Sequence, residues 1–268
     1  MVDQITFVLR NGRPVAPTID LSDPLVVRGD GCFEALRSYG GRLIGLAEHL
    51  ERLTVSAAAM FIPLPPIPYI GEWVRQVATH QGDGVIRVYA SNLDGEWNVH
   101  VLSSELPPLP GEFRLMEVTA PWHPGGHPWE LAGVKSLSYA PNMAAGRVAR
   151  MAGYDEALLI SREGLMLEGP TFTVMWVVDG TIETPSLDLG ILNSVTRRIV
   201  LGHAAELGIP VNEGHFPASR LDKADEVAYL SSVTEVTPVV EVGERDFEPG
   251  PVTAHLARAY QDEIARIV

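Results

Sequence analysis

The stretch EALLISREGLMLEGPTFTVMWVVDGTIETP (156–185) decides the fold class, because it holds four apolar runs that are each too short for a helix. Glycine, proline or charged residues bound each run, and these residues favour turns. The runs therefore predict short strands over 156–161, 165–169, 172–180 and 181–185.

Further elements are predicted on both sides of this stretch. Apolar residues at helical spacing predict helices over about 141–152, 194–207 and 252–267. Two more strands are predicted over 227–232 and 238–243. Short strands interspersed irregularly with helices indicate a mixed α/β (α+β) fold, because a doubly wound sheet would show regular strand–helix alternation.

The first hundred residues predict a smaller set of strands and helices. Two hairpins are expected, with their turns at Asn11-Gly12 and at Gly40-Gly41. Two helices over 46–60 and 70–80 and two strands over 85–91 and 98–104 complete this set.

A proline-rich stretch, SSELPPLPGEF (103–113), separates the two sets of elements. We predict a small N-terminal α/β domain over 1–107, a linker over 108–112 and a large C-terminal domain over 113–268. A second irregular stretch, PWHPGGHPWE, occupies 121–130.

The composition excludes several classes of protein. Among 268 residues, 46% are hydrophobic and 20% are charged, which is typical of a folded domain. The net charge of −14 argues against nucleic acid or an anionic membrane as the main partner. The chain shows no signal peptide and no apolar run of roughly 20 residues, so we expect a cytoplasmic protein. A single cysteine, together with histidines that form no convincing ligand pair, predicts no disulfide and no metal site.

The chain contains only two lysines, Lys135 and Lys223, so chemistry that needs a primary amine has two candidates. Lys135 has apolar neighbours, and burial favours the neutral, nucleophilic form of an amine. Lys223 stands among charged residues in SRLDKADE (219–226) and is expected to be a solvated surface residue.

Other candidates are a carboxylate and two groups of hydroxyl residues. Glu168 ends an apolar run, where it could face inward toward a cation or simply lie at the surface. The segment LNSVTRR (192–198) opens a helix, whose start could bind phosphate or only be capped by its own side chains. The cluster SSVTEVTP (231–238) could face an anion or merely form a turn, and Arg52 could bind an anion or lie exposed.

Together and in this order, these segments resemble the class IV aminotransferases, which are pyridoxal 5'-phosphate enzymes of fold type IV. The resemblance implies a small N-terminal α/β domain and a larger, cofactor-binding pseudo-barrel domain. The matching segments are RGDGCFEALRSYGG (28–41), EHLERL (48–53), KSLSYAPNMAAGRVARMAGYDEALLIS (135–161), GLMLEGPTFTV (164–174), ILNSVTRRIV (191–200) and YLSSVTEVTPVVEV (229–242).

The resemblance also implies roles for individual residues. Lys135 matches the lysine that forms a Schiff base with the cofactor, and Glu168 matches the carboxylate at the ring nitrogen. Tyr139 matches a tyrosine near the phenolic oxygen, and Leu192 a residue packed on the ring. The phosphate is expected to be bound by Arg52, Ser194, Val195, Thr196 and Ser232. Ser194 replaces a frequent glycine and Ser232 a frequent threonine, and both changes keep a donor.

The substrate carboxylate requires a cationic site. Arg28, Arg37 and Arg87 are the candidates, because their segments match the family's pocket strands. In a strand, residues two apart share a face, so Phe33, Ala35 and Arg37 are expected to point together. The resemblance also implies substrate contacts for Val233 and Thr234.

The activity implied is transamination between an amino acid and a 2-oxo acid by a ping-pong mechanism, in a homodimer. A D-amino-acid substrate is favoured because GPVTAHLARAY (250–260) resembles the tail of that subgroup. An arginine–histidine pair typical of the subgroup is not obvious in RVYASNLDGEWNVH (87–100). Branched-chain L-amino-acid transamination is the close alternative, since FEALRSY (33–39) resembles that subgroup. The other alternative is 4-amino-4-deoxychorismate lyase, although such lyases often carry a hydroxyl residue in place of Ala35.

Overall fold

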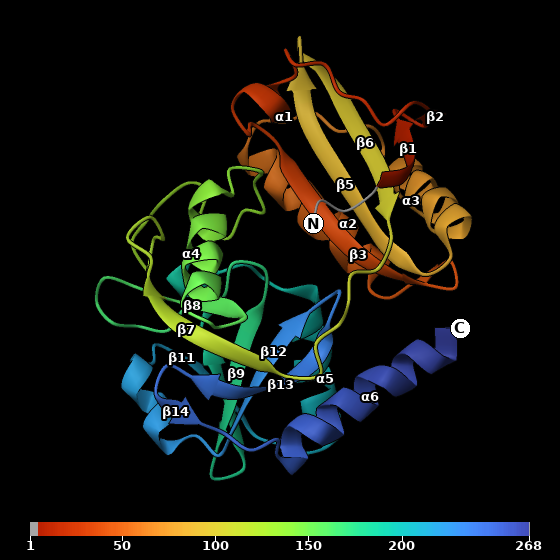
Figure 1. Cartoon of the computed structure of the whole chain (residues 1–268). Helices are drawn as coiled ribbons and strands as arrows, with labels where there is room; N and C mark the ends of the chain where they lie inside the picture. The colour runs from red at the N-terminus through yellow and green to blue at the C-terminus, as the bar shows by residue number, and fades with distance from the viewer. Residues whose placement is uncertain (1–4, 268) are drawn as a thin grey trace. The chain divides into compact units, whose positions relative to one another are not determined.

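The computed structural model describes residues 5–267 and divides them into two compact units (Figure 1). The first unit contains residues up to Leu109, the segment Val134–Tyr139 and the chain from Ile264 onward. The second contains Pro110–Gly133 and Ala140–Glu263.

The first unit is built on a six-stranded antiparallel sheet in the order β2-β1-β6-β5-β3-β4. Its strands are β1 (Ile5–Arg10), β2 (Arg13–Pro14), β3 (Cys32–Tyr39), β4 (Arg42–Leu43), β5 (Gly84–Leu93) and β6 (Glu96–Ser104). Two-residue turns with positive φ at both positions join β1 to β2, β3 to β4 and β5 to β6. The first two turns are the predicted Asn11-Gly12 and Gly40-Gly41, and the third is Asp94-Gly95.

Two helices, α2 (Leu46–Ala59) and α3 (Ile67–Gln81), cover one face of this sheet, and both were predicted (Figure 1). Their apolar sides enclose a core that includes Leu53, Val74 and Ile86. The short helix α1 (Pro24–Val27) precedes β3. The face of the sheet opposite α2 and α3, called here the open face, carries Phe33, Ala35 and Arg37 of β3 and Arg87 and Tyr89 of β5.

The second unit contains an eight-stranded mixed sheet in the order β11-β10-β9-β12-β13-β7-β8, with β14 paired to β13. Its strands are β7 (Phe113–Thr119), β8 (Glu156–Ile160), β9 (Thr173–Val178), β10 (Thr181–Pro185), β11 (Val211–Gly214), β12 (Glu226–Ser231), β13 (Glu235–Val242) and β14 (Arg245–Asp246). Its helices are α4 (Ala140–Met151), α5 (Val195–Glu206) and α6 (Pro251–Ile267), whose last residues belong to the first unit. The rings of Phe113, Tyr229 and Phe172 stack in its core.

One predicted strand is wrong. Residues 165–169 form only isolated bridges, because their backbone groups alternate between two partners. Met166 donates to the carbonyl of Phe216, whereas Leu167 donates to that of Leu159. Strands β7 and β11 were not predicted, since each buries few of its side chains.

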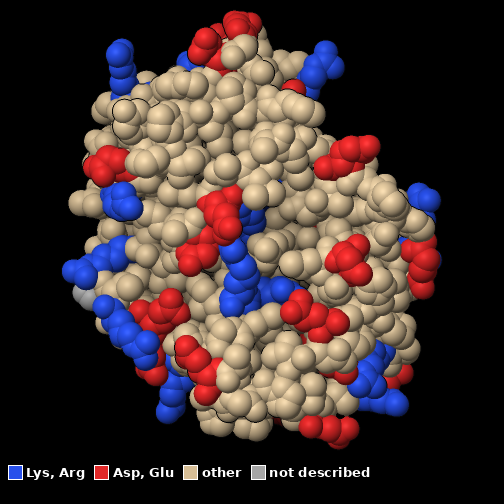
Figure 2. All heavy atoms as spheres, turned by 180° about the vertical axis from the view of Figure 1, so that it is seen from behind, with Lys and Arg blue, Asp and Glu red and all other residues tan. Residues whose placement is uncertain are grey.

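The charge of the surface and the hydropathy of the helices agree with the composition. Basic side chains lie among acidic ones on the face drawn in Figure 2. Among the described helices, none is both long and apolar enough to cross a membrane.

Truncation of a core side chain in α2 tests the packing of the first unit. Leu53 is fully buried, so Leu53→Ala should lower the free energy of unfolding by about 2–5 kcal/mol through lost burial and a cavity. Val55→Ala on the same helix, where the side chain is 63% exposed, should change it by less than about 0.5 kcal/mol. Urea unfolding measures both values, and equal effects would contradict this packing.

Candidate active site

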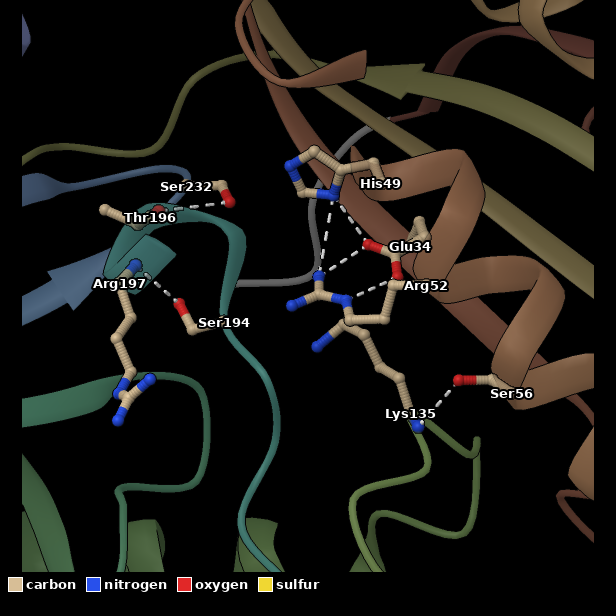
Figure 3. Close-up of polar contacts among 9 residues, drawn as sticks. All are labelled: Glu34, His49, Arg52, Ser56, Lys135, Ser194, Thr196, Arg197 and Ser232. Atoms are coloured by element: carbon tan, nitrogen blue, oxygen red, sulfur yellow. Dashed lines mark hydrogen bonds and ion pairs between the residues drawn. The ribbon is translucent and has the colours of Figure 1, made fainter. Parts of the chain in front are cut away.

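Lys135 lies on a segment that pairs with the start of β3. The amide of Phe33 donates to the carbonyl of Lys135 at 3.0 Å, and the amide of Leu137 donates to the carbonyl of Gly31 at 2.7 Å. The amide of Lys135 also donates to Oγ of Ser56 on α2, at 3.1 Å (Figure 3). The segment 134–139 therefore pairs with the start of β3, which β4 does not reach. Its backbone is held by β3 and by the side chain of Ser56.

The amine of Lys135 lies beside two aromatic rings. Its Nζ is 4.4 Å from the ring centroid of Phe33 and 5.7 Å from that of Tyr139. The two rings meet edge to face, with their centroids 5.2 Å apart. Because both rings are stiff and apolar, they restrict the positions that the half-buried amine can take.

Arg52 takes part in a buried ionic cluster with Glu34 and His49 (Figure 3). Its Nε and Nη2 donate to the two carboxylate oxygens of Glu34 at 2.7 and 2.6 Å, and Nδ1 of His49 lies 2.6 Å from one of those oxygens. Burial by itself raises the pKa of Glu34, but the charge and hydrogen bonds of Arg52, aided by His49, outweigh it and lower this pKa to about 2. A bidentate pair of this kind holds the guanidinium in one orientation.

In the second unit, hydroxyl groups gather at the start of α5. Ser194 is the N-cap, and its Oγ accepts from the amide of Arg197 at 3.2 Å. Oγ1 of Thr196 lies 3.4 Å from Oγ of Ser232, which follows β12 (Figure 3). Val195 opens the helix, so unpaired amides of its first turn lie beside these hydroxyls. Such an arrangement can bind a phosphate group.

Glu168 lies in the same unit and contacts Leu192, which stands three residues before the start of α5. Its Oε2 accepts from the amide of Leu192 at 3.1 Å. Its Oε1 lies 3.4 Å from Nε2 of His123, and the Glu168 side chain is 14% exposed. The carboxylate is therefore turned inward rather than projecting from the surface.

The turn between β12 and β13 carries the other predicted residues of the second unit. Oγ of Ser231 accepts from the amide of Thr234 at 3.1 Å and lies 2.8 Å from its Oγ1. Val233 stands within this turn, and Glu235 follows it with a positive φ of 63°. The hydroxyl of Ser231 thus helps to form the turn, whereas that of Ser232 lies beside Thr196.

The candidate arginines of the first unit differ in their placement. Phe33 pairs with Tyr89 and Ala35 with Arg87, so Phe33, Ala35, Arg37 and Arg87 share the open face, as the alternation predicted. Arg37 stacks 4.7 Å over the ring of Tyr39, and Nη1 of Arg87 donates to Oγ of Ser104 at 2.8 Å. Arg28 ends α1 and is exposed.

Lys223, the other lysine, is exposed at the end of a short 3-10 helix (Ala218–Lys223). Among the described residues, no group of three or more potential metal ligands occurs.

Three polar residues of these sites were missed by the sequence reasoning. Glu34 and His49 form the ionic cluster with Arg52. The only feature of the sequence that could have revealed it is the charge of Glu34 between Cys32 and Leu36 on the helix-facing side of β3. His123 is one of the histidines that form no convincing metal-ligand pair in the sequence, and in the structure it lies beside Glu168.

The sequence from residue 31 to 242 matches the family model described as "Amino-transferase class IV". The chain belongs to this family. It is 30% identical to a D-alanine aminotransferase of Listeria innocua, over 93% of this chain and 92% of that protein. It is 29% identical to a putative branched-chain-amino-acid aminotransferase of Methanocaldococcus jannaschii, over 91% and 90%. It is 35% identical to a bifunctional aminodeoxychorismate lyase / D-amino acid transaminase of Mycobacterium tuberculosis, over 63% and 64%.

A solved structure of similar fold is the pyridoxal-phosphate-bound form of a hypothetical aminotransferase from Mycobacterium tuberculosis. It has a TM-score of 0.88 and 26% sequence identity, and covers 98% of this chain and 99% of that chain. The protein is therefore a transaminase of fold type IV that uses pyridoxal 5'-phosphate. The donor set fits this cofactor, since Thr196 and Ser232 place hydroxyls at a helix start and Lys135 supplies an amine.

Replacing the buried acid of the ionic cluster tests what holds Arg52. Glu34→Gln should lower the free energy of unfolding at pH 7 by about 3–5 kcal/mol, because it leaves the buried guanidinium without its counter-charge. Since the folded-state pKa of Glu34 lies below its ordinary value of 4.5, its contribution is present above that value and is lost as the pH falls toward 2. The variant should lack this part of the acid dependence.

Urea unfolding between pH 2 and pH 7 measures this difference. Glu72→Gln on α3, where the side chain is 73% exposed, is the control and should behave like the natural protein. An acid dependence of Glu34→Gln equal to that of the natural protein would contradict the ionic cluster.

Proposed function

We propose that this transaminase moves the amino group of a small D-amino acid to a 2-oxo acid. The observation that carries this proposal is the open face of the first sheet, where Arg37 and Arg87 stand on neighbouring strands and which also carries Phe33, the ring beside the Lys135 amine. Guanidinium groups bind carboxylates in a fixed geometry, and both substrates of a transaminase carry one.

Bound pyridoxal phosphate supplies an aldehyde for the amino group and a ring that accepts electrons. In our proposal, Lys135 Nζ would hold the aldehyde and then move the proton of the substrate's Cα. Glu168 would hold a proton on the ring nitrogen, Tyr139 would serve the phenolic oxygen and Leu192 would pack on the ring. The phosphate would be held by Arg52, Ser194, Val195, Thr196 and Ser232.

The preference for a D-amino acid rests on relatives and on the resemblance of residues 250–260 to the tail of the D-amino-acid subgroup. A D-alanine aminotransferase is similar over nearly the whole length, and a second relative combines lyase and D-amino acid transaminase activities. Arg28, Val233 and Thr234 complete the proposed substrate contacts. The homodimer, the cytoplasmic location and the domain limits 1–107, 108–112 and 113–268 stay predictions.

A branched-chain L-amino acid is the second candidate, because of the turn between β5 and β6. This turn consists of Asp94 and Gly95 alone, so it holds neither an arginine nor a histidine of the pair typical of the D-amino-acid subgroup. The rings of Phe33 and Tyr89, 6.2 Å apart, offer apolar contacts for an aliphatic side chain. The lyase remains the third candidate, supported by the bifunctional relative.

Replacement of the lysine tests the cofactor's attachment. Lys135→Ala should abolish the visible absorbance band of the bound cofactor and reduce turnover by at least about 10⁴-fold, because both the covalent link and the proton carrier are lost. Lys223→Ala should leave spectrum and turnover unchanged. Full turnover by Lys135→Ala would overturn the proposed mechanism.

Single-turnover reactions with three donors test the substrate. D-alanine should bleach the visible band faster than L-leucine at equal concentration, because the proposed pocket serves a small D-amino acid. Bleaching by L-leucine alone would replace the proposal with the branched-chain activity. Release of 4-aminobenzoate and pyruvate from aminodeoxychorismate, without amino transfer, would establish the lyase instead.

A further inference from the structure

The irregular segment 121–130 is held firmly in the second unit although it forms no helix or strand. Nε1 of Trp122 donates to Oδ1 of Asn142 at 2.8 Å, and the amide of Gly126 donates to the carbonyl of Leu189 at 3.0 Å. Pro124 packs closely on Gly190, where an added Cβ would lie 2.5 Å from its ring. These contacts tie the segment to α4 and to the chain that leads into α5.

The segment determines which nitrogen of the neutral His123 ring carries the proton. The amide of Gly125 lies 3.2 Å from Nδ1 of His123 and donates to it. A backbone N–H cannot accept, so Nδ1 carries no proton, and the neutral ring carries its proton on Nε2. The side chain of His123 is only 8% exposed.

The protonated nitrogen faces the carboxylate of Glu168. Nε2 of His123 lies 3.4 Å from Oε1 of Glu168, while the amide of Leu192 donates to Oε2 at 3.1 Å. The two carboxylate oxygens therefore have different neighbours: Oε2 accepts a hydrogen bond from the residues before α5, and Oε1 lies at ion-pair distance from the imidazole of the segment 121–130. Contacts on both oxygens restrict rotation of the carboxylate.

We propose that His123, in its Nε2-protonated form, is a positioning residue that orients the carboxylate of Glu168. The inference rests on the proposed role of Glu168 at the cofactor's ring nitrogen. The chain of contacts runs from Gly125 through the imidazole to Glu168.

The neighbouring His127 supplies a matched control. Its side chain is 73% exposed and lies 3.4 Å from Glu163, whose side chain is 50% exposed. A substitution there alters the same segment without altering the surroundings of Glu168.

Nitrogen-15 NMR of the full-length protein, with and without cofactor, tests the protonation state directly. The ring nitrogens of His123 should show the pattern of the Nε2–H tautomer, and His123→Phe identifies the signal by its disappearance. A proton on Nδ1 in the neutral ring would overturn the inference, because no donor would then face Glu168.

A double-mutant cycle tests whether His123 acts through Glu168. His123→Phe should lower kcat by about 10- to 100-fold with little change in KM, the scale on which outer-shell partners of functional groups act. It should add nothing to the effect of Glu168→Gln, because the oriented carboxylate is then already lost. His123→Gln, which keeps a donor, should recover part of the activity, and His127→Phe should match the natural protein. Independent, multiplicative effects of the two substitutions would overturn the inference.

The same cycle measured on cofactor affinity separates this inference from the proposed function. Absorbance titration of each variant with pyridoxal phosphate requires no turnover and also covers a variant of low activity. Non-additive affinities together with no amino transfer from D-alanine by the natural protein would retain the role of His123 and reject the proposed function. Transfer from D-alanine together with additive affinities would retain the proposed function and reject the role of His123.

Discussion

The pairing of residues 134–139 with the edge of β3 is the constraint on which the candidate active site depends. It joins segments that lie about a hundred positions apart in the sequence, through two backbone hydrogen bonds and the hydroxyl of Ser56. Because backbone groups make this connection, the position of Lys135 follows from the sheet itself. The amine consequently lies beside Phe33, on the face that also carries Arg37 and Arg87.

Ionised groups in both units are positioned by partners that belong to the protein. Glu34 and His49 hold the guanidinium of Arg52, and Leu192 and His123 flank the carboxylate of Glu168. Burying a charge is costly unless donors or counter-charges satisfy it. Such partners also fix orientation, which the binding of a planar, doubly charged cofactor requires.

The family and the substrate are decided at different levels of structure. The fold, the cofactor and transamination follow from features spread along the whole chain, and the family match covers residues 31–242. Under the proposed function, the choice of amino acid falls to a few side chains of the open face and to the short turn at Asp94-Gly95. Proteins that share one fold therefore differ in substrate through loop length and pocket residues.

The sequence by itself determined the turn at Asn11-Gly12, the helices α2 and α5 and the alternation along β3, and it singled out Lys135 as a candidate amine. These features depend on neighbours within a few residues, or on the scarcity of lysine. Only the tertiary structure decided that 165–169 bridges two partners, that Glu34 binds Arg52 and that His123 faces Glu168. The Glu34–Arg52 and His123–Glu168 contacts join residues 18 and 45 positions apart, and Met166 bonds to Phe216, 50 positions away. Local periodicity carries no information about which distant groups meet.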